Sequence, residues 1–340
     1  MRRNTNARQT PMKVLYIAGW GRSGTTILDN VLSAYDSVFS VGELFYLWPR
    51  GFIERRRCGC GVTLVECPLW ADILACAYRD SPPDARRTYD LQRRSIRVRD
   101  TRRLAYGRLD ADAIRYRDEI ARLYHAIAEV TGANVIVDSS KTPAGAAVLA
   151  RIDGIEPYLL HVVRDPRATA HSWSRRVLQP DLLVPRDMPR HSAAASTATW
   201  VGWNMLVEDL ARNGYGDRSR RLRYEDFAAD PRGTVADLLE VLGVPPAGSP
   251  FTDRRELQLT ANHTVGGNPG RFRTGSITIA PDDAWRAEQA RRRRLVSTVI
   301  AAPLLRRYRY PFSSRLRVSG ALRPVATEAA GFTRGRAGED

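Results

Sequence analysis

Short apolar runs recur along the chain and predict buried β-strands. Uninterrupted apolar runs are typical of parallel strands, because helices cover both faces of a parallel sheet. We expect five strands, at residues 13–18, 38–41, 134–137, 158–163 and 221–224. Between the strands, apolar residues recur at helical spacing, as at Ile120, Leu123 and Ile127. The apolar runs and the helical spacing together indicate a domain in which strands and helices share a core.

Helical spacing and helix-stop residues locate the covering helices. Helices are expected at residues 25–34, 111–130, 143–152, 166–177, 200–211, around 238 and at 281–305. Gly132 is expected to end the second of them. Strands that alternate with helices predict the α/β class, with a mostly parallel sheet of about five strands flanked by helices.

Changes in composition divide the chain into one domain and three less regular segments. A chain of 340 residues fits a single large α/β domain, which we expect at residues 12–312. Residues 49–110 bear arginines and cysteines and interrupt the alternation, so they are interpreted as an irregular insertion over one end of the sheet. Residues 1–11 are expected to form a flexible tail, and residues 313–340 a weakly structured one.

The charge of the chain favours anionic partners. The formal net charge is +16, and of the 53 basic residues only Lys13 and Lys141 are lysines. The arginines are scattered and form no nucleic-acid-binding motif, so no nucleic-acid partner is expected. Residues 291–294 precede an apolar run, which indicates either a membrane-surface helix or the closing helix of the domain. We favour the closing helix, with weak association with anionic lipid left open.

The sequence contains no signal for membrane insertion or export. No run of about 18 apolar residues occurs, so no transmembrane segment is expected. The first 11 residues lack the apolar core of a signal peptide. The expected location is therefore cytoplasmic.

A glycine-rich loop between the first strand and the first helix carries the strongest chemical signal. It reads Gly19-Trp-Gly-Arg-Ser-Gly-Thr-Thr26, and its glycines, hydroxyls and helix N-terminus form a cradle for a phosphate-like anion. The spacing is P-loop-like, but Thr25 stands where a nucleotide triphosphatase has its lysine. The phosphate-binding candidates are Gly21, Arg22, Ser23, Gly24, Thr25 and Thr26.

A second anion-binding motif follows the fourth predicted strand. Leu160-His-Val-Val-Arg-Asp-Pro-Arg167 places Arg164 at the strand end, and Ser172 lies eight residues later in the next helix. Ligands of open parallel sheets bind at the carboxyl ends of the strands, where an arginine presents its fork to a phosphate. A turn salt bridge between Arg164 and Asp165 is the structural alternative.

The two motifs together resemble those of sulfotransferases that use 3′-phosphoadenosine-5′-phosphosulfate (PAPS). Arg22-Ser-Gly-Thr-Thr26 is similar to the 5′-phosphosulfate loop, and arginine before the serine resembles the bacterial and Golgi branches, including the tyrosylprotein sulfotransferases. Arg164 and Ser172 are similar to the 3′-phosphate site. The resemblance covers most of residues 12–310 and implies PAPS as sulfate donor and a hydroxyl-bearing acceptor, with no metal required. A P-loop kinase is the alternative, which Thr25 and Arg164 disfavour.

The resemblance implies further residues that approach the nucleotide. Tyr224, within Arg223-Tyr-Glu-Asp-Phe227, is similar to a tyrosine at a strand end that approaches it. Residues 263–273 resemble a loop that closes over the 3′-phosphate in the bacterial branch. The Arg-Lys-Gly triplet of the cytosolic branch is absent, so Arg271 and Arg273 are both candidates.

Sulfuryl transfer requires a base for the acceptor hydroxyl and cations for the leaving phosphate. Arg22 and Lys141 are the predicted cations, since Lys141 follows Asp138-Ser-Ser at the end of the third strand. Glu43 is the predicted base: it lies 21 residues after Arg22, an offset similar to that of the catalytic glutamate of the tyrosylprotein branch. Histidine is the rival base, but none of the five histidines shows the cytosolic pattern, and His161 is expected in the core.

The insertion is expected to determine acceptor specificity. Cys58, Cys60 and Cys67 could hold zinc, but the four-ligand pairing of structural zinc sites is missing, so we expect reduced thiols and no metal. The aromatic residues of this region line an acceptor cleft or form core beneath the insertion; they are Phe45, Tyr46, Trp48 and Trp70. A carbohydrate, glycolipid or small-metabolite acceptor is favoured over a protein tyrosine.

Overall fold

A single five-stranded parallel sheet forms the centre of the described chain. The computed structural model describes residues 11–79, 81 and 83–313. Neighbouring strands of this sheet all pair in parallel. Their order is β2 (Val38–Gly42), β3 (Val135–Lys141), β1 (Met12–Ala18), β4 (Ile155–Val163) and β7 (Ser219–Arg223). The predicted α/β class, the parallel sheet and its five strands are confirmed.

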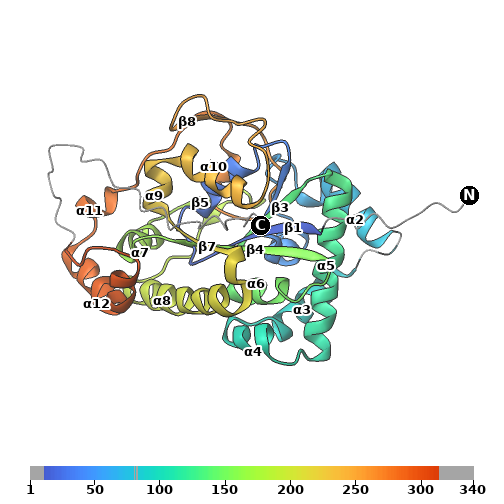
Figure 1. Cartoon of the computed structure of the whole chain (residues 1–340), viewed down its shortest axis with the longest axis horizontal. Coiled ribbons are helices and arrows are strands. Elements are labelled where there is room, and N and C mark those ends of the chain that lie inside the picture. The colour runs from blue at the N-terminus through green and yellow to red at the C-terminus, as the bar shows by residue number, and fades with distance from the viewer. Residues whose placement is uncertain (1–10, 80, 82, 314–340) are drawn as a thin grey trace, which may run out of the picture.

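Alternation along β1 explains why helices cover both faces of the sheet. Val14 and Tyr16 belong to one buried cluster, whereas Leu15 and Ile17 belong to another. Successive side chains of a strand point to opposite faces, so an all-apolar strand needs cover on both sides. Figure 1 shows the strands running between an upper and a lower layer of helices.

Different helices cover the two faces. The Leu15 face is covered by α1 (Thr25–Leu32), α9 (Tyr224–Ala229) and α10 (Pro231–Val241). The Tyr16 face is covered by α5 (Ala111–Thr131), α6 (Pro143–Leu149) and α8 (Ala193–Leu210). Gly132 ends α5 in the left-handed conformation, as predicted.

The insertion is more regular than predicted. It contains α2 (Pro68–Tyr78), α3 (Ala85–Ser95) and α4 (Thr101–Tyr106), so the expectation of an irregular segment at 49–110 was wrong. α2 and α3 pack on α5, and α4 packs on α6. Short helices such as α3 are mostly polar and gain their stability from this packing, which a local pattern does not reveal.

The C-terminal helix is also broken, contrary to the single helix expected at 281–305. The chain forms α11 (Ala284–Glu288) and α12 (Arg291–Arg307), with extended backbone at Gln289 and Ala290 between them. The Gln289 side chain is buried and donates to the Arg167 carbonyl oxygen over 3.2 Å, which fixes the break against α7 (Pro166–Ser174). α12 packs on α7 and α8, consistent with its role as the closing helix.

Helix ends differ from the predictions where capping side chains decide them. α8 begins at Ala193 rather than residue 200, because the Ser192 hydroxyl accepts from Ala195 N at 3.2 Å. α7 ends at Ser174 and α6 at Leu149, each three residues earlier than expected. None of the helices in the described part of the chain is long and apolar enough to cross a membrane.

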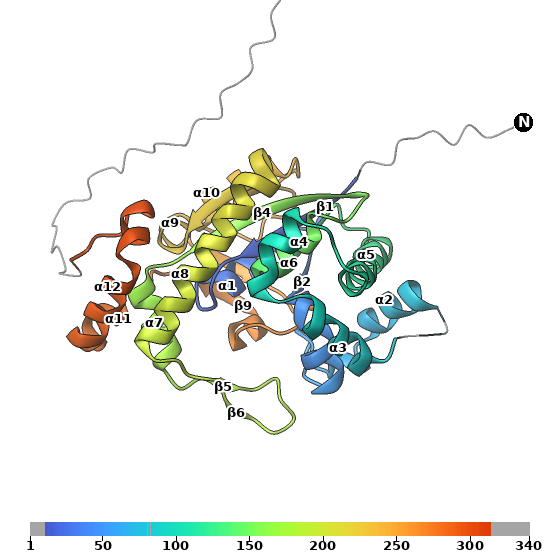
Figure 2. The same ribbon diagram turned by 90° about the horizontal axis from the view of Figure 1, so that it is seen from below.

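Two small hairpins lie outside the main sheet. β5 (Leu178–Gln179) and β6 (Arg186–Asp187) pair antiparallel in a loop that projects from the body of the molecule in Figure 2. β8 (Glu256–Leu259) pairs antiparallel with β9 (Gly275–Thr278). Between β8 and β9 the chain returns to the edge of the main sheet, where Val265 bridges Gly42 at the end of β2.

Candidate active site

The glycine-rich loop turns tightly between β1 and α1. Gly24 precedes α1 with a φ of +81°, and a Cβ there would lie 2.2 Å from Cδ2 of Tyr224. Only glycine fits both constraints. The Ser23 hydroxyl donates to the Trp20 carbonyl over 2.7 Å and is buried, as is Thr25. The loop therefore surrounds the N-terminus of α1 with backbone N–H groups, the arrangement that binds anions.

Arg22 lies in this loop with an unmet hydrogen-bond donor. Its backbone is left-handed, with a φ of +71°, and its guanidinium carbon lies 5.1 Å from the centre of the Trp173 ring. Its Nε is buried and has no hydrogen-bond partner within the described residues. Burial lowers the pKa of Arg22, and the negative charge of Glu43 opposes that shift. A buried guanidinium donor without a partner fits a site that receives an anionic oxygen.

Arg164 joins the second predicted motif to the first. From the end of β4 its Nη1 donates to the Arg22 carbonyl over 3.0 Å, and its guanidinium carbon lies 4.5 Å from the centre of the Tyr224 ring. Its Nη2 donates to Oδ2 of Asp282 over 2.8 Å. The predicted alternative, a pair with Asp165, does not form, because Asp165 pairs with Arg167 at 2.6 Å.

Ser172 and Tyr224 lie on the elements that flank this junction. Ser172 is partly buried on α7, and its hydroxyl has no hydrogen bond to any residue that the structure describes. α7 is fixed to the loop by Trp173, whose Nε1 donates to the Gly21 carbonyl over 3.1 Å. Tyr224 starts α9 directly after β7, with its ring between Gly24 and Arg164.

Glu43 is buried between two cations. Lys141 Nζ donates to its Oε1, and Arg50 Nη1 donates to its Oε2 over 2.7 Å. Burial alone would raise the pKa of Glu43, but Lys141 and Arg50 together hold it below its ordinary value. The carboxylate is therefore ionised at neutral pH. Sequence reasoning missed Arg50, which lies in the helical turn Leu47–Ile53 of the insertion.

The end of β3, which carries Lys141, is held by a buried carboxylate. Asp138 accepts from the Tyr124 hydroxyl over 2.6 Å and from Ser140 N over 2.8 Å. Burial raises the pKa of Asp138 to about 6 against these hydrogen bonds. Lys141 has a φ of +71°, and this backbone conformation accompanies the contact of its side chain with Glu43. A left-handed lysine is uncommon and is typical of a functional position.

The segment between β8 and β9 lies against both the loop and the base. Glu43 N donates to the Val265 carbonyl over 2.7 Å, and Val265 N donates to the Val41 carbonyl over 2.8 Å. Asn268 N donates to the Thr26 hydroxyl over 3.4 Å. The predicted closing loop at 263–273 therefore contacts the end of β2 and the glycine-rich loop.

The two arginine candidates in this loop differ in their surroundings. Arg271 is 1% exposed, and it donates to the carbonyl oxygens of Thr264, over 2.5 Å, and Arg57, over 2.6 Å. Burial lowers the pKa of Arg271, and Asp181 opposes that shift. Arg273 is exposed, and its guanidinium has no hydrogen bond or ion pair with the described part of the chain. Arg271 braces the loop, whereas Arg273 is available to a ligand.

Comparison with known proteins decides the family. A sequence model described as the sulfotransferase family matches residues 15–247. This chain belongs to the sulfotransferase family. The resemblance predicted from the two anion-binding motifs is thereby confirmed. Membership supports transfer of a sulfuryl group in general, and the donor and acceptor are considered below.

Solved structures similar to this sulfotransferase include three bacterial ones. The sulfotransferase domain from the Synechococcus PCC 7002 olefin synthase is 19% identical with a TM-score of 0.48, covering 89% of this chain and 98% of that one. The sulfotransferase domain from the curacin biosynthetic pathway is 19% identical with a TM-score of 0.46, covering 89% and 99%. A sulfotransferase from Alicyclobacillus acidocaldarius is 14% identical with a TM-score of 0.37, covering 87% and 96%. No match was found among curated proteins.

A hollow of about 270 Å³ opens in the sulfotransferase beside Tyr224 and Asp282. Its other walls include Glu225, Trp285 and Tyr310. Asp282, one of the residues that line the hollow, pairs with Arg164 at the end of β4. Its size approaches that of small-ligand sites.

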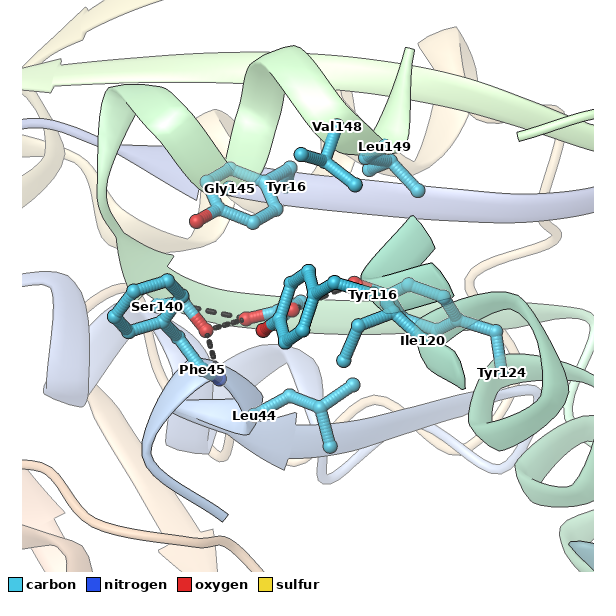
Figure 3. A pocket seen from close by; sticks show the side chains of 11 residues that line it. Tyr16, Leu44, Phe45, Tyr116, Ile120, Tyr124, Ser140, Gly145, Val148 and Leu149 are labelled. Atoms are coloured by element: carbon cyan, nitrogen blue, oxygen red, sulfur yellow. Dashed lines mark hydrogen bonds between the residues drawn. The ribbon is translucent and has the colours of Figure 1, made fainter. Parts of the chain in front are cut away.

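A much smaller cavity lies behind the turn of Lys141. It has a volume of about 20 Å³, and Figure 3 shows Tyr16, Tyr116 and Tyr124 along its walls with Phe45 and Ser140 at one end. This volume suits a single water molecule and excludes an acceptor substrate. Of the predicted aromatic set, Trp48 and Trp70 are core, whereas Phe45 and Tyr46 are partly exposed next to Glu43.

Three cysteines and one histidine meet on the insertion side of the sulfotransferase. The Sγ atoms of Cys58, Cys60 and Cys67 and a ring nitrogen of His263 all lie within 4.8 Å of one another. His263 lies in the predicted closing loop, and no fourth ligand was predicted for the cysteines. The fold supplies it from 196 residues beyond Cys67.

Proposed function

We propose that this sulfotransferase transfers the sulfuryl group of PAPS to a hydroxyl group of its acceptor. The observation that carries the proposal is the hydrogen bond from Arg164 to the Arg22 carbonyl. It joins the predicted 3′-phosphate arginine to the predicted 5′-phosphosulfate loop, although the two residues are 142 positions apart. A nucleotide with phosphates on both ends of its ribose needs two anion sites in one crevice.

The donor groups around the crevice fit such a nucleotide. Arg22 and Arg164 each have a buried Nε without a partner among the described residues. The Ser172 hydroxyl and the Arg273 guanidinium are likewise unengaged there. In this structure the Asp282 carboxylate pairs with Arg164, and it lies where Arg164 would bind an anion of a ligand. The hollow beside Tyr224 offers room for the nucleoside.

PAPS supplies an activated sulfuryl group whose bond to the 5′-phosphate breaks as the new bond to the acceptor oxygen forms. Glu43 is ionised and accepts the proton that the acceptor hydroxyl loses. Lys141 and Arg22 neutralise the charge that develops on the leaving phosphate. The backbone N–H groups at the start of α1 hold that phosphate in place.

Lys141 connects the two halves of this chemistry. As long as it pairs with Glu43, the carboxylate is a weak base, because the ammonium group lowers its pKa. A phosphate oxygen that attracts Lys141 would weaken the pair and raise the basicity of Glu43. Binding of the donor thereby prepares the base, which links deprotonation of the acceptor to the presence of the sulfuryl group.

The acceptor side is formed by the first part of the insertion. Arg50 pairs with Glu43, and its guanidinium carbon lies 3.7 Å from the centre of the Tyr46 ring. A face that combines an aromatic ring, a cation and a carboxylate fits a polyhydroxylated acceptor, so a carbohydrate, glycolipid or small metabolite is favoured. A kinase function has less support, because Thr25 replaces the phosphate-binding lysine and the family is that of sulfotransferases.

Calorimetric titration with 3′,5′-adenosine bisphosphate tests the donor. We expect binding that is selective over ADP and ATP, and Arg164→Ala should lose at least about tenfold in affinity, as expected for a charge-assisted hydrogen bond. Arg115→Ala is the control, because Arg115 lies exposed on α5 away from the crevice. A preference for ATP with magnesium, or equal affinity for nucleotides with and without the 3′-phosphate, would overturn the proposal.

Transfer of radiolabelled sulfate from PAPS to a panel of sugars, glycolipids, phenols and tyrosine peptides tests the acceptor class. We expect labelled carbohydrate, glycolipid or small-metabolite products with the wild-type protein and none with Glu43→Gln. Labelling confined to tyrosine peptides would overturn the acceptor preference while leaving the donor proposal intact.

A further inference from the structure

The cluster formed by Cys58, Cys60, Cys67 and His263 has the size of a tetrahedral metal site. Zn–S bonds of about 2.3 Å and Zn–N bonds of about 2.1 Å place neighbouring sulfurs about 3.8 Å apart and sulfur and nitrogen about 3.6 Å apart. The Cys60 and Cys67 sulfurs are 3.8 Å apart. His263 Nδ1 lies 3.2 Å from the Cys67 sulfur and 3.9 Å from the Cys58 sulfur. We infer that these four residues bind one structural zinc ion.

The local backbone places each sulfur where a metal needs it. Cys58 and Cys60 flank Gly59 in a tight turn, in which Gly61 N donates to the Cys58 carbonyl over 2.9 Å and Cys58 N donates to the Val62 carbonyl over 2.8 Å. This turn resembles the knuckles on which structural zinc sites are built, because it brings two thiolates to one side of the chain. Gly59 has no room for a side chain, since a Cβ would lie 1.9 Å from Asn262 Oδ1.

The third sulfur and the histidine are fixed by other elements. Cys67 is the N-cap of α2, so its sulfur is positioned by the first turn of that helix. Trp70 on the same helix donates from Nε1 to the His263 carbonyl over 2.8 Å, which holds the histidine against the cysteines. Gly59 N donates to the Thr264 carbonyl over 3.1 Å and ties the knuckle to the loop that carries His263. The turn at Gly59, α2 and the loop at Thr264 thus hold the four side chains together.

The ligand chemistry selects zinc. Three thiolates and one imidazole in tetrahedral arrangement are a closed structural zinc set, with no position left for water or substrate. A disulfide would use two of the three sulfurs and leave the third sulfur and the imidazole without a function. Cys76, the fourth cysteine, lies on α2 outside the cluster and therefore provides an internal control.

The zinc ion would fasten the insertion to the loop that covers the proposed donor site, and this consequence rests on the proposed function. His263 precedes Val265, which pairs with Glu43 through the backbone, and Asn268, which contacts Thr26. Three ligands come from the insertion and one comes from the loop. The metal would therefore cross-link two segments that are far apart in the sequence. Loss of zinc should loosen residues 264–273 and weaken nucleotide binding, while the sheet and its helices remain folded.

Metal analysis of the purified full-length chain tests the inference directly. Wild-type protein produced in zinc-supplemented medium and purified without chelators should contain about one zinc ion per chain, and Cys76→Ser should contain the same amount. Cys67→Ser and His263→Ala should contain less than about a tenth of that, because a three-ligand site opens to water. Cobalt added to the apoprotein should produce a thiolate-to-cobalt charge-transfer band and tetrahedral d–d bands.

Several outcomes would overturn the inference. One is that the purified wild-type protein contains no zinc and that added zinc does not slow the reaction of its thiols. Another is that the site contains iron in place of zinc. A third is that Cys60 and Cys67 form a disulfide under reducing conditions. Should Cys67→Ser fail to fold, the wild-type metal content and cobalt spectrum still decide. These readouts do not involve PAPS, so a metal-bound protein that ignores 3′,5′-adenosine bisphosphate would refute the proposed function and leave the zinc site standing.

Discussion

Lys141 Nζ donates a hydrogen bond to Glu43 Oε1 and joins the end of β3 to the residue after β2. The two residues are 98 positions apart, and separate roles were predicted for them, Lys141 as a cation and Glu43 as the base. Their pairing means that each controls the other, because the ammonium group sets the basicity of the carboxylate. It also places both at the carboxyl end of the sheet, where ligands of parallel α/β folds bind.

Replacement of Lys141 should have two measurable effects, one on the rate of sulfate transfer and one on the pKa of Glu43. Lys141→Met should reduce kcat for sulfate transfer by about 10²–10³-fold, because a cation that stabilises the leaving phosphate is lost. The acid limb of the pH profile should move to higher pH, since Glu43 loses the cation that lowers its pKa. Steady-state kinetics over a pH series measure both effects.

Lys13→Met is the matched control. Lys13 is the other lysine of the chain, and its Nζ donates to the Leu242 carbonyl over 2.7 Å near the start of β1. The control should leave the pH profile in place. An unchanged acid limb in Lys141→Met would mean that Glu43 is not the group whose ionisation limits activity.

The ion pairs of Glu43 should make the free energy of unfolding depend on pH in the acidic range. The folded pKa of Glu43 lies below its ordinary value of 4.5, so its pairs stabilise the fold above that pH and lose their effect as pH falls through the folded value. Glu43→Gln should lower the free energy of unfolding by about 2 kcal/mol at pH 7, because it leaves two partly buried cations without their carboxylate.

Urea unfolding of wild type and Glu43→Gln at a series of pH values checks this expectation. The difference between the two proteins should shrink below about pH 4.5, as the wild-type carboxyl becomes protonated. A constant difference from neutral to acidic pH would mean that the contribution of Glu43 is not ionic.

Arg271 should contribute to the stability of the fold, whereas Arg273 should contribute to nucleotide binding. Arg271→Ala should cost about 3 kcal/mol of unfolding free energy, because it removes the donors to the Thr264 and Arg57 carbonyls and leaves the buried Asp181 with Arg56 as its remaining cation. Arg273→Ala should keep wild-type stability and weaken binding of 3′,5′-adenosine bisphosphate by about tenfold. Thermal unfolding and calorimetry on both variants distinguish the roles, and wild-type nucleotide affinity in Arg273→Ala would assign the 3′-phosphate contact elsewhere.

Gly24 should tolerate no side chain. Gly24→Ala combines a left-handed backbone, which costs about 1 kcal/mol, with a collision against the Tyr224 ring. Displacement of that ring from Arg164 should abolish measurable nucleotide binding. Gly132→Ala shares the left-handed backbone, with a φ of +66° and open space around it, and should lose about 1 kcal/mol of stability while binding normally. Equal nucleotide affinity in the two variants would show that the position of Tyr224 is unimportant.

Much of the fold was predictable because local pattern and tertiary structure agree there. The five apolar strands, the glycine-rich loop and the start of α1 are specified within short stretches and occur near their predicted positions, although β3 continues to Lys141, β4 begins at Ile155, and β7 covers Ser219–Arg223. The helices of the insertion and the break at Gln289 were not predicted. α2 and α3 depend on packing against α5, α4 depends on packing against α6, and the break depends on a hydrogen bond to Arg167; a local pattern reveals none of these partners.

The candidate site was predictable residue by residue, but its pairings were not. The sequence offered Glu43, Lys141, Arg22 and Arg164 as separate groups, whereas the fold pairs Lys141 with Glu43 and connects Arg164 to Arg22. Arg50 was missed because nothing in a run of insertion arginines distinguishes it. His263 was missed as a partner of the cysteines because ligand spacing rules apply to nearby residues, and this one comes from the far end of the domain.

The hydrogen bond from Arg271 to the Arg57 carbonyl affects how acceptor preference can be transplanted between relatives. In a chimera that receives only a foreign insertion, the carbonyl at position 57 would no longer be held where Arg271 can donate to it. The host loop would still lie next to the glycine-rich turn. Residues 49–110 and 262–273 therefore form one unit of exchange, although about 150 residues separate them in the sequence. Grafts that carry both segments should keep a working donor site, and grafts that carry one should lose it together with stability.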